Sequence, residues 1–160
     1  MEKKSAGLLL YRYRNGALEV FLVHPGGPIW ANKDMGSWSI PKGEFGPDED
    51  PLAAARREFE EETGFKVDGR FTALTPVKQR NKKLVFAWAV EGDCDTALAK
   101  SNTFPLEWPP HSGITREFPE IDRAAWFSMA TAREKIFDGQ IGLLDELEKI
   151  LAGDQQMVHQ

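Results

Sequence analysis

The stretch REFEEETGF, residues 57–65, crowds four glutamates into five consecutive positions. Glu58 and Glu62 stand four residues apart, and like charges at that spacing destabilise a helix by about 0.2–0.5 kcal/mol. Gly64 is expected just past the helix end, so the carboxylates also lie near the negative end of the helix dipole. A bound divalent cation would offset both costs, because Mg²⁺ and Mn²⁺ favour hard oxygen ligands of this kind.

Residues 51–63 have the pattern of an amphipathic helix. Asp50 is a suitable N-cap, and Pro51 suits the first helical position. The apolar residues that recur on one face are Leu52, Ala55 and Phe59. A helix that starts after Asp50 and ends before Gly64 is therefore predicted.

The acidic residues of this helix divide between two faces. At about 100° per residue, Glu58, Glu61 and Glu62 share one face, whereas Glu60 points elsewhere and is expected at the surface. Arg57 precedes Glu61 by four residues, and a charge-assisted contact between them is expected. Three glutamates alone are more often a solvated helix face than a metal site, so their surroundings must decide.

The bulk composition is that of a folded globular protein. The chain has 160 residues, 41% of them hydrophobic and 28% charged, which predicts a single domain over residues 1–153 and a polar tail over 154–160. A net charge of −5 argues against binding to duplex nucleic acid, which needs a broad basic surface. The apolar run at residues 6–10 is too short to cross a bilayer, so neither membrane insertion nor a targeting segment is expected.

Cysteine usage bears on the compartment and on the type of metal site. Cys94 is the only cysteine, so neither an intrachain disulfide nor a cysteine-rich zinc site can form. A cytoplasmic location is the simplest expectation.

Hydrophobic patterns predict the remaining elements. A hairpin is expected from strands at residues 7–13 and 17–24, because the turn Asn15-Gly16 tolerates positive φ angles. An irregular loop is expected at residues 25–36, and a long connection rich in proline at 101–113. Further strands are expected at residues 38–41, 71–80, 84–90 and 124–127. Helices are expected at residues 131–137 and 141–151, the last ended by Gly153.

A longer signature surrounds the acidic helix. The pattern G-x5-E-x7-R-E-U-x-E-E-x-G-U, in which U is a bulky apolar residue, is matched at every fixed position by Gly43, Glu49, Arg57, Glu58, Phe59, Glu61, Glu62, Gly64 and Phe65. This region resembles the Nudix hydrolase family. The resemblance implies an α/β fold, an α/β/α sandwich with a mixed β-sheet.

The resemblance also implies a metal site and a reaction. The family's box glutamates, here Glu58, Glu61 and Glu62, supply carboxylate ligands to Mg²⁺, with Mn²⁺ as an alternative, and the carbonyl of Gly43 is a further ligand. The reaction implied is attack of an activated water on a phosphorus of a nucleoside diphosphate linked to a group X.

Other positions of the family pattern add roles around this centre. Glu49 would orient the site. The catalytic set implied by the resemblance comprises Glu58, Glu61, Glu62, Arg57 and Glu120, with Arg57 pairing with box glutamates and Glu120 matching a late glutamate that often assists.

Residues outside the box are candidates for the substrate. Lys42, next to the box, and the basic residues Arg80 and Lys82 are suited to phosphate contacts, although a solvated hairpin tip is the commoner reason for the second pair. Trp30 is a candidate for stacking on a base, while most aromatic residues are core residues.

The resemblance does not determine a single substrate. The resemblance favours a small-molecule nucleotide, either a nucleoside triphosphate or a dinucleoside polyphosphate such as diadenosine tetraphosphate. The alternatives are an ADP-ribose or nucleotide-sugar pyrophosphatase and a regulator that binds nucleotides without turnover.

Overall fold

The chain folds around one mixed β-sheet, as the sequence predicted. The computed structural model describes residues 3–158. The strands are β1 (Lys4–Arg14), β2 (Ala17–Pro25), β3 (Lys42–Glu44), β4 (Thr72–Ala73), β5 (Val77–Lys78), β6 (Leu84–Glu91), β7 (Thr103–Glu107), β8 (Thr115–Pro119) and β9 (Ile121–Ser128). The helices are α1 (Pro51–Thr63), α2 (Met129–Lys135) and α3 (Ile141–Val158), with short 3₁₀ turns η1 (Thr96–Leu98) and η2 (Asp138–Gln140).

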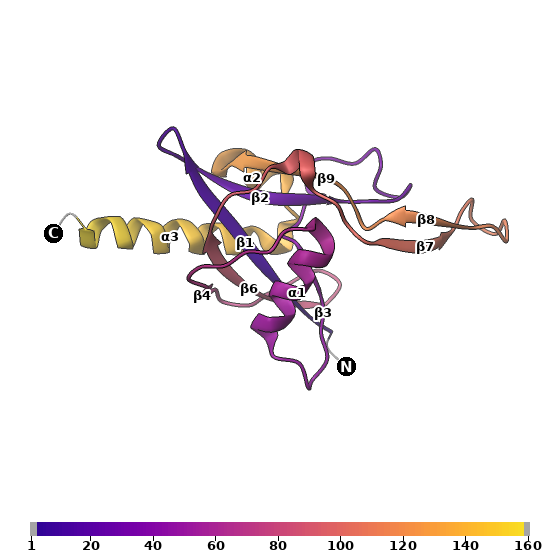
Figure 1. The fold of residues 1–160 in the computed structure, drawn as a ribbon, viewed down its shortest axis with the longest axis horizontal. Coiled ribbons are helices and arrows are strands. Elements are labelled where there is room, and N and C mark those ends of the chain that lie inside the picture. The colour runs from indigo at the N-terminus through magenta and orange to yellow at the C-terminus, as the bar shows by residue number, and fades with distance from the viewer. Residues whose placement is uncertain (1–2, 159–160) are drawn as a thin grey trace.

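The main sheet runs in the order β4-β6-β1-β2-β9, with β3 paired to β1 and β5 paired to β6 (Figure 1). β1 and β6 are parallel, and the other pairs are antiparallel. The hairpin of β1 and β2 turns at Asn15 and Gly16, whose φ angles are 53° and 81°, as predicted from that dipeptide. None of the helices in the described part of the chain is long and apolar enough to cross a membrane.

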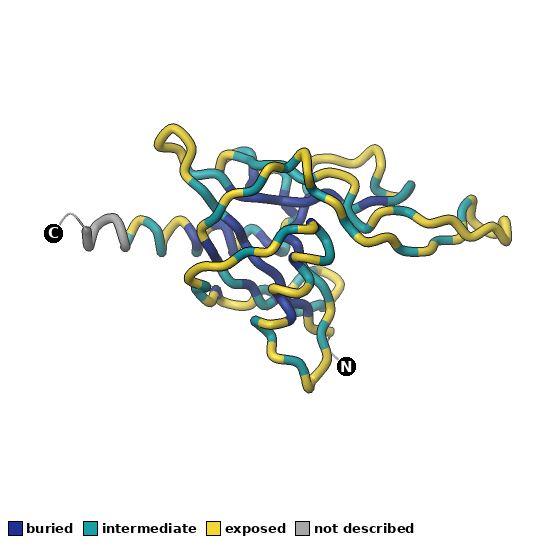
Figure 2. The backbone as a smooth tube through the Cα atoms, in the orientation of Figure 1, coloured by how far each residue is buried: buried dark blue, intermediate teal, exposed yellow. Residues whose placement is uncertain are grey.

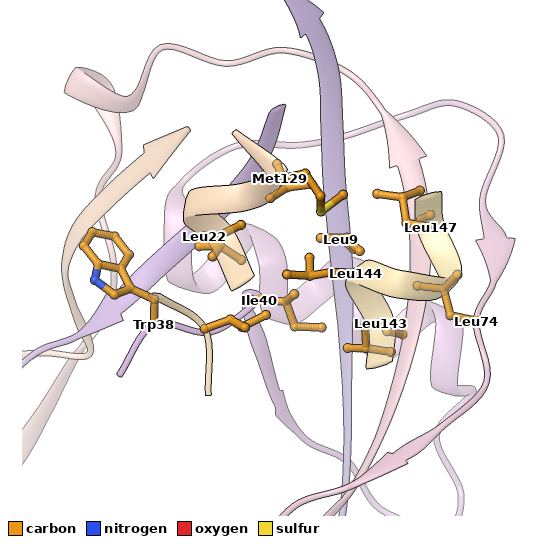
Figure 3. Packing of buried hydrophobic residues seen from close by; sticks show 14 of the residues in the cluster. Leu9, Leu22, Trp38, Ile40, Leu74, Met129, Leu143, Leu144 and Leu147 are labelled. Carbon is orange, nitrogen blue, oxygen red and sulfur yellow. The ribbon is translucent and has the colours of Figure 1, made fainter. Parts of the chain in front are cut away.

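Two hydrophobic cores lie on the two faces of this sheet, because alternate residues of a strand point to opposite sides. On one face Leu8 and Phe21 pack with Phe59 of α1. On the other, Leu9 and Leu22 pack with the apolar face of α3, which includes Leu143, Leu144 and Leu147 (Figure 3). The buried residues follow the central strands, while exposed residues dominate the extremities (Figure 2). Helix α1 is thus held in position by packing on one face of the sheet.

Helix α1 has the ends that its sequence predicted. The Asp50 carboxylate accepts a hydrogen bond of 2.9 Å from the backbone N–H of Ala53, and Pro51 occupies the first helical position. Gly64 ends the helix with a φ of 81°, a left-handed conformation that favours glycine. Both caps come from short-range chemistry, which explains why sequence alone located them.

The expectation of an irregular connection at residues 101–113 was wrong for residues 103–107, which form β7, and is confirmed for the turn at 108–113. Strands β7 and β8 form a separate antiparallel hairpin, here called the arm, which projects from the body of the molecule (Figure 1). Pro105 pairs in register with Glu117. A two-stranded hairpin leaves one edge of each strand free, and proline is tolerated at such an edge. The prolines of this segment therefore hid a strand.

Three smaller expectations also need correction. Residues 38–41 form isolated bridges rather than a strand, through Ser39 with Val23 and Trp38 with Ile136. The strand expected at residues 71–80 is two short strands, β4 and β5. Helix α3 continues past Gly153 to Val158; of the predicted polar tail, residues 159–160 lie outside the described residues.

Candidate active site

The carboxylates of α1 lie against the backbone of β3. The backbone N–H of Lys42 donates to Glu62 Oε2 at 3.2 Å. A Cβ atom at Gly43 would lie 2.0 Å from Glu58 Oε2, so a residue with a side chain would displace that carboxylate. Gly43 and Glu58 are thus brought together as the sequence predicted, and only glycine allows this close approach.

Arg57 holds the neighbouring carboxylates in position. Its guanidinium donates to Glu49 at 2.9 Å, to Glu58 at 2.9 Å and to Glu61 at 3.2 Å. The contact between Arg57 and Glu61 was expected from their spacing. Glu60 is exposed and lies outside this network, also as expected. Arg57 therefore positions three of the glutamates.

Burial changes the acidity of this cluster. Burial raises the pKa of Glu62 from 4.5 to about 8. The pKa of Glu58 is also raised, first by burial and then by the charge of Glu61. In both cases the favourable contacts, of Lys42 with Glu62 and of Arg57 with Glu58, offset burial only in part. A cation placed among these oxygens would reverse the shifts, so the chemistry of the donor set fits a hard divalent metal.

The three box glutamates do not converge in this structure. Among residues 3–158, no group of three or more His, Cys, Asp or Glu side chains is arranged so that it could hold a metal ion. The reason is visible in the hydrogen bonds: Arg57 draws Glu58 and Glu61 toward itself, whereas Glu62 accepts from the backbone of β3. The shared face predicted for the trio is therefore present without a closed ligand set.

Glu120, from the segment between β8 and β9, also reaches this site. Its backbone N–H donates to the Asn102 carbonyl at 2.8 Å, and the Asn102 N–H donates to the Glu61 carbonyl at 3.0 Å. The N–H of Gly26 donates to the Glu120 carbonyl at 2.8 Å. The pKa of Glu120 is raised by burial and then by the charge of Glu61. A residue 59 positions beyond Glu61 is thus placed beside the acidic helix.

A cavity of about 720 Å³ opens next to Lys42. Three of the four residues that the sequence assigned to the substrate line it: Trp30, Lys42 and Arg80. Lys82, the fourth, is exposed and does not line the cavity. Burial lowers the pKa of Lys42, and the charge of Lys83 lowers it further, while Glu62 opposes the shift.

Other wall residues of this cavity gave no sign of their role in the sequence. Phe137 lies edge-on to Trp30, with ring centroids 5.6 Å apart. Gln79 accepts a hydrogen bond of 2.9 Å from the amide of Gln140, a buried side chain that also accepts from the backbone N–H of Ile40. These residues reach the cavity through tertiary packing, and no local pattern announces that.

A buried histidine contacts the backbone of the loop that carries Trp30. The ring of His24 is fully buried and lies 2.7 Å from the Asp122 carboxylate and 2.7 Å from the Lys33 carbonyl. The Lys33 ammonium lies over the Trp30 ring, 4.8 Å from its centroid. His24 was assigned no role from the sequence; its contacts give it a structural one.

Comparisons with known proteins bear on the family and the fold of this chain. The NUDIX domain family model matches residues 1–147. A comparison with curated proteins finds no significant match. Among solved structures, a C. elegans Ap4A hydrolase in a binary complex is 26% identical, with a TM-score of 0.62, over 94% of this chain and 98% of that one.

Two further structures are similar at lower identity. A mutT/nudix family protein of Listeria innocua is 16% identical, with a TM-score of 0.64, over 97% of each chain. The NUDIX domain of NrtR from Shewanella oneidensis, solved with ADP ribose, is 14% identical, with a TM-score of 0.63, over 94% of this chain and 89% of that one. At such identities these two likenesses show the fold alone.

Proposed function

The chain belongs to the Nudix family and is a hydrolase of pyrophosphate bonds, and we propose that it cleaves small nucleoside polyphosphates with Mg²⁺ as cofactor. The observation that carries this proposal is the position of the acidic face of α1. Lys42 joins that face to the cavity, since its backbone bonds to Glu62 and it lines the cavity with Trp30. An anionic substrate in the cavity would therefore lie beside the carboxylates.

Glu58, Glu61 and Glu62, with the Gly43 carbonyl, are the residues that would hold the metal. Bound Mg²⁺, or Mn²⁺ in its place, neutralises phosphate oxygens and lowers the pKa of a water. Arg57 would keep its contact with Glu49, while Glu58 and Glu61 would exchange their contacts with Arg57 for the ion. The donor set consists of carboxylate and carbonyl oxygens, which suits such an ion.

The reaction itself needs a water nucleophile, a leaving phosphate and a side chain that accepts a proton. Water attacks one phosphorus, the bond from that phosphorus to the bridging oxygen breaks, and the leaving phosphate keeps the electron pair. A glutamate accepts the proton of the water. Glu120 is the candidate, because it lies beside the acidic helix without belonging to the proposed ligand set, and burial raises its pKa toward the range in which a general base works well.

The cavity supports a nucleotide as the substrate. Lys42 and Arg80 offer positive charge to phosphate oxygens, and the rings of Trp30 and Phe137 offer an aromatic surface for a base. The likeness to the C. elegans Ap4A hydrolase supports dinucleoside polyphosphates and nucleoside triphosphates as the substrates to test first.

The single cysteine, Cys94, is free, which supports the proposal of a cytoplasmic location.

A panel of nucleotides tests this proposal. Purified protein with Mg²⁺ is incubated in ¹⁸O-labelled water with nucleoside triphosphates, diadenosine tetraphosphate, ADP-ribose and a nucleotide sugar, and the products are identified by mass spectrometry. We expect one labelled oxygen in a single phosphate-containing product of the first two classes. Survival of every compound would contradict catalysis and favour a domain that only binds nucleotides.

A further inference from the structure

A second cavity, of about 370 Å³, adjoins the acidic residues from another side. Glu62 and Glu120 line it, and Trp30 lines both this cavity and the larger one. Both volumes lie in the range of ligand pockets, about 300–1,000 Å³. Trp30 thus lines both cavities, whereas Glu62 and Glu120 line only the smaller one.

The arm supplies one wall of this second cavity. Phe104 and Leu106 of β7 line it and are half-buried, whereas the residues on either side of them along the strand are exposed. This alternation is that of a strand with one covered face. Phe104 also packs on Phe118 of β8, with ring centroids 6.3 Å apart. The apolar side of the arm therefore faces the site.

The loop that follows β2 fixes the arm in this position. A Cβ atom at Gly26 would lie 1.9 Å from the Pro119 carbonyl oxygen, so the two backbones touch. Gly27 has a φ of 93°, and a Cβ atom there would lie 3.1 Å from the ring of Phe104. Only glycines permit this contact, which makes the wall a built feature of the site.

The two cavities differ in chemistry. The larger one has two basic side chains in its lining, Lys42 and Arg80, beside the acidic Glu134 and Asp138. Arg80 pairs with Asp138 at 3.4 Å, so Lys42 is the main positive partner for a phosphate. None of the described residues that line the smaller one is basic; apart from Glu62 and Glu120 its side chains are apolar, among them Pro25, Pro28 and Ile29. Apart from a cation held by Glu62, a phosphate group would find no positive partner there, whereas an uncharged planar group would cover apolar surface.

We infer that the arm forms a second subsite, which takes the end group of the substrate on the far side of the reacting phosphates. This inference rests on the proposed function and narrows it to nucleoside polyphosphates with an aromatic or apolar group at both ends. A dinucleoside polyphosphate is the simplest case. One base lies by Trp30 and Phe137, the phosphates pass Lys42 and the carboxylates, and the second base lies against Phe104 and Leu106.

Replacing Leu106 tests the second subsite. Leu106→Ala is compared with Ile114→Ala, a matched loss of an aliphatic side chain on the same arm, at a position that is 50% exposed and does not line the cavity. KM and kcat are measured with diadenosine tetraphosphate and with ATP, which has only one base. Leu106→Ala removes the contact between the second base and an apolar side chain. We therefore expect it to raise KM for diadenosine tetraphosphate about tenfold. KM for ATP should stay unchanged within about twofold.

The possible outcomes separate this inference from the proposed function. Equal changes of KM for the two substrates, or the same change in Ile114→Ala, would overturn the second subsite while leaving hydrolysis established. If the unmodified protein cleaves neither compound, the proposed function fails, and calorimetric titration with the same two ligands still decides the inference. In that case tighter binding of the dinucleotide, lost in Leu106→Ala, supports the subsite, and equal affinities contradict it.

Discussion

Arg57 supplies positive charge to three of the glutamates at this site. It donates to Glu49, Glu58 and Glu61, and without it these carboxylates would repel one another. Glu62 is excluded from this arrangement and is the most strongly shifted of the box glutamates. Its burial gives the site a reason to bind positive charge.

Replacing Glu61 by glutamine should remove most of the activity. The change keeps the size of the side chain but removes one charge from the proposed ligand set, so we expect kcat to fall at least about 100-fold. The stabilisation of the folded protein by Mg²⁺ in thermal unfolding should fall as well. Glu60→Gln is the control, because Glu60 is exposed on the same helix; equal activities of the two variants would refute the assignment of Glu61.

The raised pKa of Glu62 predicts how stability depends on pH in the absence of metal. Its pKa in the folded chain is about 8 against an ordinary 4.5, so between these values the folded state binds more protons than the unfolded state. The free energy of unfolding should therefore fall as pH rises from about 5 to about 8. Urea unfolding in EDTA at several pH values measures this. Glu62→Gln should show a weaker fall, and identical pH dependence of the two proteins would exclude Glu62 as its source.

Sequence reasoning predicted the features that depend on spacing. The helix that carries the box glutamates and the contact of Arg57 with Glu61 both follow from a short signature, and Lys42 was singled out because it directly precedes that signature. Phe137 and Gln79 were not predicted as cavity residues, because their positions in the cavity depend on η2 and on the buried amide of Gln140. No local pattern encodes such contacts.

At the level of elements, α1 was predicted almost residue by residue, since its caps and its period are local. The arm was missed because its prolines, Pro105 among them, favoured an irregular segment, and because the loop on which it packs, at Gly26 and Gly27, lies far away in the sequence. Strand β3 was also missed. It has three residues and exists through pairing with β1, which sequence periodicity does not reveal.

The N-cap of α1 should contribute measurably to stability. Asp50→Ala removes the acceptor for the Ala53 N–H, and we expect the free energy of unfolding to fall by about 1 kcal/mol. Asp50→Asn keeps an equivalent acceptor and should cost much less. Denaturant unfolding of both variants makes the comparison. A loss of equal size in both would mean that the charge of Asp50, rather than its cap, stabilises the helix.

For the molecule as a whole, the two cores divide their tasks between the two faces of the sheet. The core around Phe59 holds α1 and its carboxylates, and the core around Leu144 holds α3 on the other face. Both cores pack on the same sheet, which supports the proposal that residues 1–153 form one domain. Damage to the core around Leu144 should therefore leave the carboxylates of α1 in place, whereas the cavity wall at Phe137 and Gly139 lies next to α3.

Leu144→Ala tests this division. Leu144 is fully buried, so truncation should lower the free energy of unfolding by about 2–5 kcal/mol. Below the unfolding transition, kcat should match that of the unmodified protein, because α3 covers the opposite face of the sheet from α1. A large change in kcat with normal folding would show that the two faces are coupled.

The position of a bound metal tests the central claim most directly. A crystal of the protein grown with Mn²⁺ is measured at a wavelength at which manganese scatters anomalously. We expect one or more anomalous peaks within coordination distance of Glu58, Glu61 and Glu62, with the first two turned from Arg57 toward the ion. A structure in which Mn²⁺ binds elsewhere, or in which Arg57 keeps all its carboxylates and no peak lies among them, would contradict the account.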